Sequence, residues 1–376
     1  MNPEPLNPEP VNPCCMPLKS IAYFISSHGF GHAARAAAVM QAIAENDASV
    51  QFEIFTAVPS WFFQDSLSTP FNYHHLLTDF GLAQKTPFQS DLGDTLRSLN
   101  QFYPIAPMHL DDISKAIRRL ECGIIICDIA PMGLLVAKNT GIPSVLVENF
   151  TWDWIYQQYA VVNKNIKKYI DYLKPVFESA DYHIQTEPIC SRKSPDLVSA
   201  PVSRKPRTSR DQIRQRLGLP ADGNVILITT GGIPQHYDFL QKLDKMRELT
   251  FVMPGAGPEM KINDNLIILP HQSDIYHPDL ANASDAVIGK VGYSTLAEVY
   301  HAGIPFGYVA RANYNESGPM VDFIKQQMPG IALEETEFHA GGWISKLTEL
   351  LELPRVHRQG ANGAEQIGKF ILSILK

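Results

Sequence analysis

The sequence predicts an α/β protein made of two Rossmann-like, doubly wound parallel-sheet domains that face each other across a cleft. Two observations lead to this fold class. Short apolar runs alternate with helical patterns along most of the chain, which is typical of βαβ units and parallel sheets. The alternation stops between Ser194 and Arg210, where three prolines interrupt a polar, basic stretch, and then starts again. The length of 376 residues is enough for two or three domains.

These observations divide the chain into four parts. Residues 1–17 repeat Asn-Pro-Glu-Pro, offer almost nothing to bury, and are expected to form a disordered tail. Residues 18–200 are expected to form the N-terminal domain, residues 201–210 the linker, and residues 211–376 the C-terminal domain. The last helix of the chain can pack back on the N-terminal domain.

The N-terminal half opens with the apolar run Ile21–Ile25, which we expect to be a buried strand followed by a glycine-containing turn. A helix to about Glu45 follows, because apolar residues recur there at helical spacing. Further strands are predicted at Phe52–Thr56, Tyr73–Leu77, Gly123–Cys127, Pro143–Val147 and Asp181–Gln185. Helices are predicted at Ile113–Leu120 and over the long stretch Trp154–Ala180.

The C-terminal half repeats this alternation. Strands are predicted at Val225–Thr229, Thr250–Met253, Leu266–Leu269, Asp285–Ile288 and Phe306–Ala310, and a last helix at Ala364–Leu375. Ligands of doubly wound sheets bind at the carboxyl ends of the strands. With two such domains, we expect the functional site in the cleft between them.

Composition and charge exclude several classes of protein. Lys plus Arg is 32 and Asp plus Glu is 39, a formal charge of −7 without a basic block, so we expect no nucleic-acid partner. No run of about 18 apolar residues is present, so no transmembrane segment is expected, although peripheral membrane contact stays possible. The five cysteines lack a paired CxxC pattern, and no signal peptide is visible. We therefore expect a cytoplasmic protein.

The stretch from Ser26 to Arg35 lies between a predicted strand and a predicted helix, where a ligand-binding loop belongs. Gly29 and Gly31 permit a tight turn and the close approach of a ligand. His28 and His32 suit proton transfer, and the helix N-terminus near His32 favours the neutral imidazole that a general base needs.

There are two alternatives to a catalytic His32. His32 can be a helix-start residue whose ring is satisfied by backbone groups. Gly29-x-Gly31-x-x-Ala34 also fits a loose dinucleotide fingerprint, but that fingerprint needs an acidic residue at the end of the second strand, and Glu53 comes too early.

Asp128 ends a predicted buried strand and should therefore lie on the same rim as His32. A carboxylate there can accept the second ring N–H of His32 and fix its tautomer. The alternative is that Asp128 caps the next helix, which has Pro131 in its first turn.

A second loop, from Ile288 to Glu298, again joins a strand to a helix and has the composition of a diphosphate cradle. Its expected binding residues are Gly289, Gly292, Lys290, Ser294 and Thr295. Glu298 can accept both hydroxyls of a ribose, or it can close a capping box with Thr295. The turn Thr230-Gly231-Gly232 can touch phosphate oxygens, or it can be only a tight turn.

Three stretches give the chain a resemblance to nucleotide-sugar glycosyltransferases of the B fold. They are His28-Gly-Phe-Gly-His-Ala-Ala-Arg35, Glu148-Asn-Phe-Thr-Trp-Asp-Trp154, and Gly289-Lys-Val-Gly-Tyr-Ser-Thr295 with Glu298. The chain is most similar to the branch that includes the N-terminal half of plant L-arabinokinases. More distantly it resembles the peptidoglycan N-acetylglucosaminyl transferase and plant UDP-sugar transferases.

The resemblance implies roles for individual residues. His32 matches the base that deprotonates the acceptor hydroxyl, and Asp128 matches the acid that supports it. Glu298 matches the ribose ligand, and Lys290 falls where plant enzymes carry a phosphate-binding histidine. Asn315 and Glu316 match the position of an acid–amide pair that contacts the donor sugar, although the order and identities differ here, and a solvated loop is the alternative.

Trp152 and Trp154 lie in the second stretch and can form an acceptor-side platform, although aromatic residues of this kind are more often core. No Asp-x-Asp pair is present to hold a metal, so we expect no metal site and no cofactor beyond the nucleoside-diphosphate sugar donor. The expected activity is an inverting, metal-independent sugar transfer to an acceptor hydroxyl. A sugar-nucleotide 2-epimerase and a non-catalytic sugar-nucleotide binding module are the two alternatives.

Overall fold

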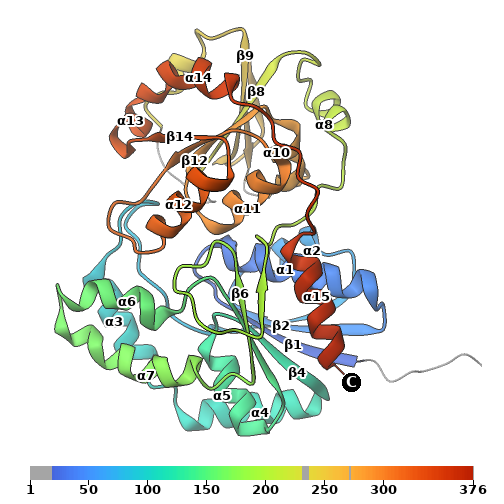
Figure 1. The fold of residues 1–376 in the computed structure, drawn as a ribbon, viewed down its shortest axis with the longest axis vertical. Coiled ribbons are helices and arrows are strands. Elements are labelled where there is room, and N and C mark those ends of the chain that lie inside the picture. The colour runs from blue at the N-terminus through green and yellow to red at the C-terminus, as the bar shows by residue number, and fades with distance from the viewer. Residues whose placement is uncertain (1–18, 231–236, 271, 376) are drawn as a thin grey trace, which may run out of the picture.

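The computed structural model describes residues 19–230, 237–270 and 272–375, so the predicted tail lies outside the described residues. Two seven-stranded sheets, each flanked by helices, form two layered domains that stack one above the other in Figure 1. This arrangement confirms the predicted fold class. The central strands of each sheet are buried, which is why they read as continuous apolar runs in the sequence. The edge strands Phe71–His75 and Lys261–Asn263 are partly or fully exposed.

The first sheet has the strand order β3-β2-β1-β4-β5-β6-β7, and every neighbouring pair is parallel. Its strands are β1 (Lys19–Ile25), β2 (Val50–Thr56), β3 (Phe71–His75), β4 (Cys122–Asp128), β5 (Ser144–Glu148), β6 (Tyr182–Thr186) and β7 (Leu197–Ser199). Its helices are α1 (Phe30–Asn46), α2 (Ser60–Ser66), α3 (Leu92–Phe102), α4 (Pro107–Arg119), α5 (Pro131–Thr140), α6 (Trp152–Ala160) and α7 (Lys167–Phe177).

The second sheet repeats the same winding in the order β10-β11-β9-β8-β12-β13-β14, with only β10 antiparallel to its neighbour among the described strands. Its strands are β8 (Asn224–Thr229), β9 (Leu249–Gly257), β10 (Lys261–Asn263), β11 (Leu266–Pro270), β12 (Ala286–Lys290), β13 (Phe306–Val309) and β14 (Gly330–Leu333). The helices of this half are α8 (Arg210–Arg216), α9 (Leu240–Leu243), α10 (His277–Ala283), α11 (Tyr293–Ala302), α12 (Ser317–Gln327), α13 (Glu335–Ala340), α14 (Leu347–Glu352) and α15 (Gly363–Ile374).

One predicted helix is wrong in its extent. The stretch Trp154–Ala180 is not continuous, because α6 ends at Ala160 and α7 begins only at Lys167. Between them the side chain of Asn163 accepts a hydrogen bond from the Asn165 amide at 3.0 Å and starts a short 3-10 turn. Asparagine side chains compete in this way with helical hydrogen bonds, which explains the break.

The chain crosses between the domains twice. Residues 200–209 have no regular structure, yet Pro201 to Arg204 are buried rather than exposed. Near the C-terminus, Asn362 caps α15 and also donates to the Ser203 carbonyl at 2.8 Å. Helix α15 then packs on α1, with Gly368 against Ala42, and lies beside the lower domain in Figure 1. The last helix of the chain is therefore part of the N-terminal domain's surface.

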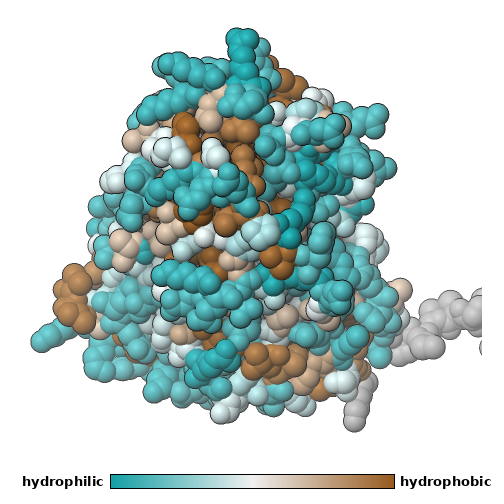
Figure 2. Space-filling view, turned by 45° about the horizontal axis from the view of Figure 1, so that its top comes forward, coloured by the Kyte–Doolittle hydropathy of each residue, from teal (hydrophilic) through white to brown (hydrophobic). Residues whose placement is uncertain are grey.

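The face of the molecule in Figure 2 is mostly hydrophilic, with apolar residues in separate groups. Within the described ranges, no helix combines the length and the apolar character needed to cross a bilayer.

The winding of each sheet reverses direction at one point, and ligands of such sheets bind there. In the first sheet the reversal lies between β1 and β4, where Ile25 pairs with Asp128. In the second it lies between β8 and β12, where Thr229 pairs with Gly289. The loops after these four strands therefore meet in the cleft.

The close approach of β8 and β12 predicts that Gly289→Ala destabilises the fold. A Cβ at this position would clash with the carbonyl oxygen of Thr229. We expect a loss of about 1–3 kcal/mol in the free energy of unfolding, the usual cost of overpacking, measured by chemical denaturation. Gly292→Ala is the matched control, because no atom lies within 4 Å of a Cβ there and its φ is −146°. Equal stability of the two variants would contradict this account.

Candidate active site

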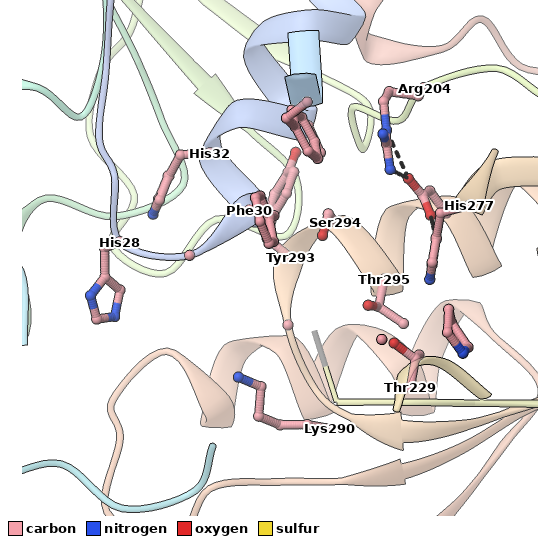
Figure 3. Close-up of a pocket in the computed structure, with 18 of the residues that line it drawn as sticks. His28, Phe30, His32, Arg204, Thr229, His277, Lys290, Tyr293, Ser294 and Thr295 are labelled. Carbon is pink, nitrogen blue, oxygen red and sulfur yellow. Dashed lines mark hydrogen bonds and ion pairs between the residues drawn. The ribbon is translucent and has the colours of Figure 1, made fainter. Parts of the chain in front are cut away.

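A pocket of about 200 Å³ lies where the two reversal points face each other. The N-terminal domain contributes the loop from His28 to His32, and the C-terminal domain contributes Lys290, the start of α11 and Glu298. In Figure 3 His28 and His32 lie on one side of this pocket, and Lys290 projects toward it from the other. Seven further predicted site residues also line the pocket: Gly29, Gly31, Gly292, Ser294, Thr295, Glu298 and Glu316.

His32 and Asp128 come together as a hydrogen-bonded pair. His32 stands in the first turn of α1, and its Nδ1 lies 3.0 Å from Asp128 Oδ1 at the end of β4. Because an ionised carboxylate only accepts hydrogen bonds, the neutral form of His32 carries its proton on Nδ1 and keeps a lone pair on Nε2. In this tautomer Nδ1 cannot accept from Arg35 Nη2, which lies 3.3 Å from it and donates to Asp128 instead. The cap alternative for Asp128 is wrong, since α5 has Ala130 as its N-cap without a side-chain cap.

Arg35 is a site residue to which the sequence analysis gave no role. Its guanidinium is buried and donates to both carboxylate oxygens of Asp128, from Nε at 2.8 Å and from Nη2 at 2.6 Å. Burial by itself would raise the pKa of Asp128, but the charge and hydrogen bonds of Arg35 outweigh it and lower this pKa. Arg35 stands three residues after His32 on the same helix face, a spacing that signals a shared environment.

The two tryptophans do not form the expected acceptor platform. Trp152 is fully buried, and its Nε1 donates to Asp79 Oδ2 at 2.6 Å. Its ring meets the edge of His28 at a centroid distance of 5.0 Å and so supports the histidine from behind. Trp154 is half-buried against the core, and neither tryptophan lines the pocket. The core alternative is therefore the one that the structure shows.

His28 is held neutral beside His32. Burial first, and then the charges of His32, Arg311 and Lys290, lower the pKa of His28 well below its usual value. The pocket therefore holds the neutral imidazole of His28 at physiological pH.

Lys290 and Arg311 form the cationic side of the pocket. Burial, followed by the charge of Arg311, lowers the pKa of Lys290 to about 7, while Glu316 opposes this shift. Arg311 stacks on the ring of Tyr314 at 3.3 Å and donates to Glu316 Oε2 at 3.3 Å. Its Nε is buried without a hydrogen-bond partner among the described residues. An anion bound in this pocket would favour the charged form of Lys290 and could accept a hydrogen bond from the unpaired Nε–H of Arg311.

Glu298 is already paired on both oxygens. Arg204 Nη2 donates to Oε1 at 3.0 Å, and His277 Nδ1 lies 2.7 Å from Oε2 (Figure 3). Burial would raise the pKa of Glu298, but Arg204 and then His277 outweigh it and lower this pKa. The capping-box alternative is wrong, because α11 begins at Tyr293 with Gly292 as N-cap and has no side-chain cap.

The remaining predicted residues have mixed placements. Glu316 is buried and lines the pocket, so the solvated-loop alternative does not hold for it, whereas Asn315 does not line the pocket. Gly289 lies in β12 behind the lining, and Thr230 is buried beside Tyr237, with its neighbour Thr229 at the pocket wall. Gly231 and Gly232 lie outside the described residues.

An aromatic wall on the N-terminal side was also missed. Phe30 stacks on Phe62 at a centroid distance of 5.1 Å, and Trp61 lies 5.7 Å from Phe30. All three line the pocket. Trp61 and Phe62 lie in α2, which the sequence analysis did not predict. Across the described part of the chain, no group of three or more His, Cys, Asp or Glu side chains is arranged to hold a metal ion.

Comparison with known proteins supports the resemblance inferred from the motifs. No family model matches the chain. L-arabinokinase of Arabidopsis thaliana is 26% identical over 352 residues, which cover 92% of this chain but only 33% of that protein. An uncharacterised glycosyltransferase of Methanopyrus kandleri, MK0977, is 22% identical over 335 residues, covering 79% of this chain and 90% of that protein. The chain thus spans about a third of the first relative and most of the second.

Solved structures share the whole architecture. A UDP-glucosyltransferase from Polygonum tinctorium aligns with a TM-score of 0.60 and 13% identity, over 96% of this chain and 92% of that structure. At this identity the likeness concerns the fold. The chain is therefore a homologue of L-arabinokinase and of the Methanopyrus glycosyltransferase, and it has the two-domain B fold of the glycosyltransferases.

Proposed function

We propose that this protein is a glycosyltransferase that moves a sugar from a nucleoside-diphosphate sugar to an acceptor hydroxyl. One observation carries the proposal: His32, which is hydrogen-bonded to the buried Asp128, lines the same pocket as the cations Lys290 and Arg311 of the opposite domain. A base on one side and an anion site on the other are what a displacement at an anomeric carbon needs. The glycosyltransferase name of the Methanopyrus relative agrees with this assignment.

His32 is the proposed general base. Its Nε2 takes the proton of the acceptor hydroxyl while that oxygen forms a bond to the anomeric carbon. The bond from this carbon to the diphosphate breaks, and its electron pair leaves with the diphosphate. In the proposed reaction the acceptor oxygen attacks from the side opposite the leaving diphosphate, so that the anomeric centre is inverted. The placement of His32 and Lys290 in opposite domains supports this stereochemistry. Asp128 stabilises the imidazolium that forms.

The leaving diphosphate is the proposed ligand of the cationic side. Lys290, Arg311 and the N-terminus of α11 with Ser294 and Thr295 would stabilise its negative charge. These groups supply the neutralisation that a metal ion gives in other transferases, so the proposed reaction is metal-independent.

The donor's sugar and ribose fit the two buried carboxylates of the C-terminal side. Glu298 keeps lone pairs beyond those used by Arg204 and His277, and these can accept ribose hydroxyls. Glu316, beside Arg311, is the proposed acceptor for hydroxyls of the donor sugar. The acceptor would lie against Phe30, Trp61 and Phe62, an apolar wall that suits a molecule with a flat apolar face.

His32→Ala is predicted to lower kcat by about 10²-fold or more while leaving donor affinity nearly unchanged, because the base acts only during transfer. Steady-state kinetics and calorimetric donor binding measure the two effects. Glu298→Gln is the matched contrast, which should weaken donor binding more than it lowers kcat. Unchanged turnover in His32→Ala would contradict the assignment.

The same assays separate the alternatives. Conversion of the sugar nucleotide without an acceptor, and without release of free sugar, would indicate the epimerase. Binding of the sugar nucleotide without any turnover would indicate the binding module.

We predict that the Lys290 amine takes up a proton when a nucleoside diphosphate such as UDP binds. With its pKa at about 7, the free amine is mostly neutral at about pH 8.5, where the diphosphate is fully ionised. The bound anion favours the ammonium form, raises this pKa and therefore draws a proton from the buffer. Calorimetry in buffers of different ionisation enthalpy measures the uptake, and Lys290→Met should abolish it. Equal uptake in both proteins would exclude Lys290 as its source.

A further inference from the structure

A continuous line of polar contacts joins the proposed base to the proposed donor-sugar site across the domain boundary. It runs from His32 through Asp128 to Arg35, as described above. Arg35 Nη1 then donates to Asn149 Oδ1 at 2.7 Å, and Asn149 Nδ2 donates to Glu316 Oε1 at 3.1 Å. Arg311 holds the other oxygen of Glu316. We call the Arg35–Asn149–Glu316 segment the cross-domain tie.

Asn149 is placed so that it can serve both ends of the tie. It directly follows β5, next to β4 and Asp128, and its side chain is fully buried. Its carbonyl oxygen faces a donor and its amide group faces an acceptor, so its orientation is set by both neighbours. A carboxamide offers an acceptor oxygen and a donor amide group in one plane, and asparagine is the shorter of the two side chains that carry one.

The charges at the two ends make the tie specific. Arg35 is committed to Asp128 on Nε and Nη2, which leaves Nη1 for Asn149. Arg35 also lies 4.7 Å from the ring centroid of Tyr293, the first residue of α11. The buried guanidinium therefore contacts the base's partner on one side and the donor-domain helix on the other. Buried polar networks in which every member is satisfied have one preferred geometry.

We propose that Asn149 is a positioning residue that keeps Glu316 and the His32–Asp128 pair in register, so that the donor sugar is held in line with the base. The proposal rests on the proposed function, because it gives Glu316 the donor sugar and His32 the acceptor proton. Asn149 itself touches neither reactant. It acts through Arg35 on one domain and through Glu316 on the other.

Reversal of the hydrogen bond tests the tie. Asn149→Asp places a carboxylate against Glu316 and should lower kcat roughly tenfold, the scale of coupling in a shared hydrogen-bond network. Glu316→Gln alone should also lower activity, because Glu316 is proposed to bind the sugar. In the double variant, the carboxylate introduced at position 149 accepts a hydrogen bond from the amide introduced at position 316, with the total charge unchanged. Its kcat should exceed the product of the two single effects by roughly tenfold.

Two controls make the rescue specific. Asn149→Ser is too short to span the gap, so Asn149→Ser with Glu316→Gln should show no rescue. Asn149→Ser also serves as the variant that tests the tie if the Asn149→Asp protein does not fold. Thr186→Val removes a longer Arg35 contact of 3.5 Å and a hydrogen bond of 3.4 Å to the Glu148 carbonyl, but it leaves the Asn149–Glu316 bond intact. It should therefore change kcat far less than Asn149→Asp. The proposal would be overturned if the kcat of Asn149→Asp with Glu316→Gln equalled the product of the two single effects. It would also be overturned if Asn149→Ser with Glu316→Gln showed the same rescue.

Failure of the proposed function can be recognised separately. If the unmodified protein transfers sugar from none of UDP-glucose, dTDP-glucose and GDP-mannose, the proposed function fails. The tie is then judged by calorimetric affinity of the four proteins of the cycle for whichever of these nucleotides binds. If the tie positions Glu316, the two substitutions change the binding free energy of the sugar nucleotide non-additively. Their effects on the matching diphosphate, which lacks the sugar, are additive. Additive effects for both ligands would overturn it.

Discussion

The buried ion pair between Arg35 and Asp128 is the interaction on which the rest of the site depends. Both side chains are almost fully removed from water, and a buried charge is tolerated only when it is paired and hydrogen-bonded. The pair satisfies this condition with two contacts and leaves Asp128 able to accept a third, from His32. It thereby sets the tautomer of the proposed base and fixes the start of α1 against the end of β4.

The same principle of paired burial operates on the opposite side of the cleft. Arg204 reaches from the inter-domain segment to Glu298, and its guanidinium also packs over the rings of Phe62 and Tyr276, one from each domain. Its Nη1 donates to Ser66 Oγ at 3.0 Å. Arg35 and Arg204 are thus two buried cations that each contact both domains. The proposed donor and acceptor sites face each other in the geometry that these contacts define.

The fold could be predicted from the sequence because buried parallel strands leave continuous apolar runs, and the carboxyl ends of these strands then located His32, Asp128 and the α11 loop. Side-chain partners distant in sequence could not be predicted. Arg204 and Glu298 are 94 residues apart, and Asn149 and Glu316 are 167 apart, so no local pattern connects them. The acceptor platform expected at the two tryptophans was wrong for a related reason, because composition does not say which face of α6 meets the core. How Asn315, Thr230 and the other predicted ligands act stays a prediction.

The most direct test of the central claim, that this cleft binds a nucleoside-diphosphate sugar, is thermal unfolding with a panel of UDP, dTDP, GDP, their common sugars, ATP and NAD. A ligand at about 100 times its dissociation constant stabilises the folded state by about 2.7 kcal/mol, which is a measurable shift. The account predicts stabilisation by one nucleoside-diphosphate family, and a smaller shift in the Lys290→Met variant. Stabilisation by NAD alone, or by none of these ligands, would contradict it.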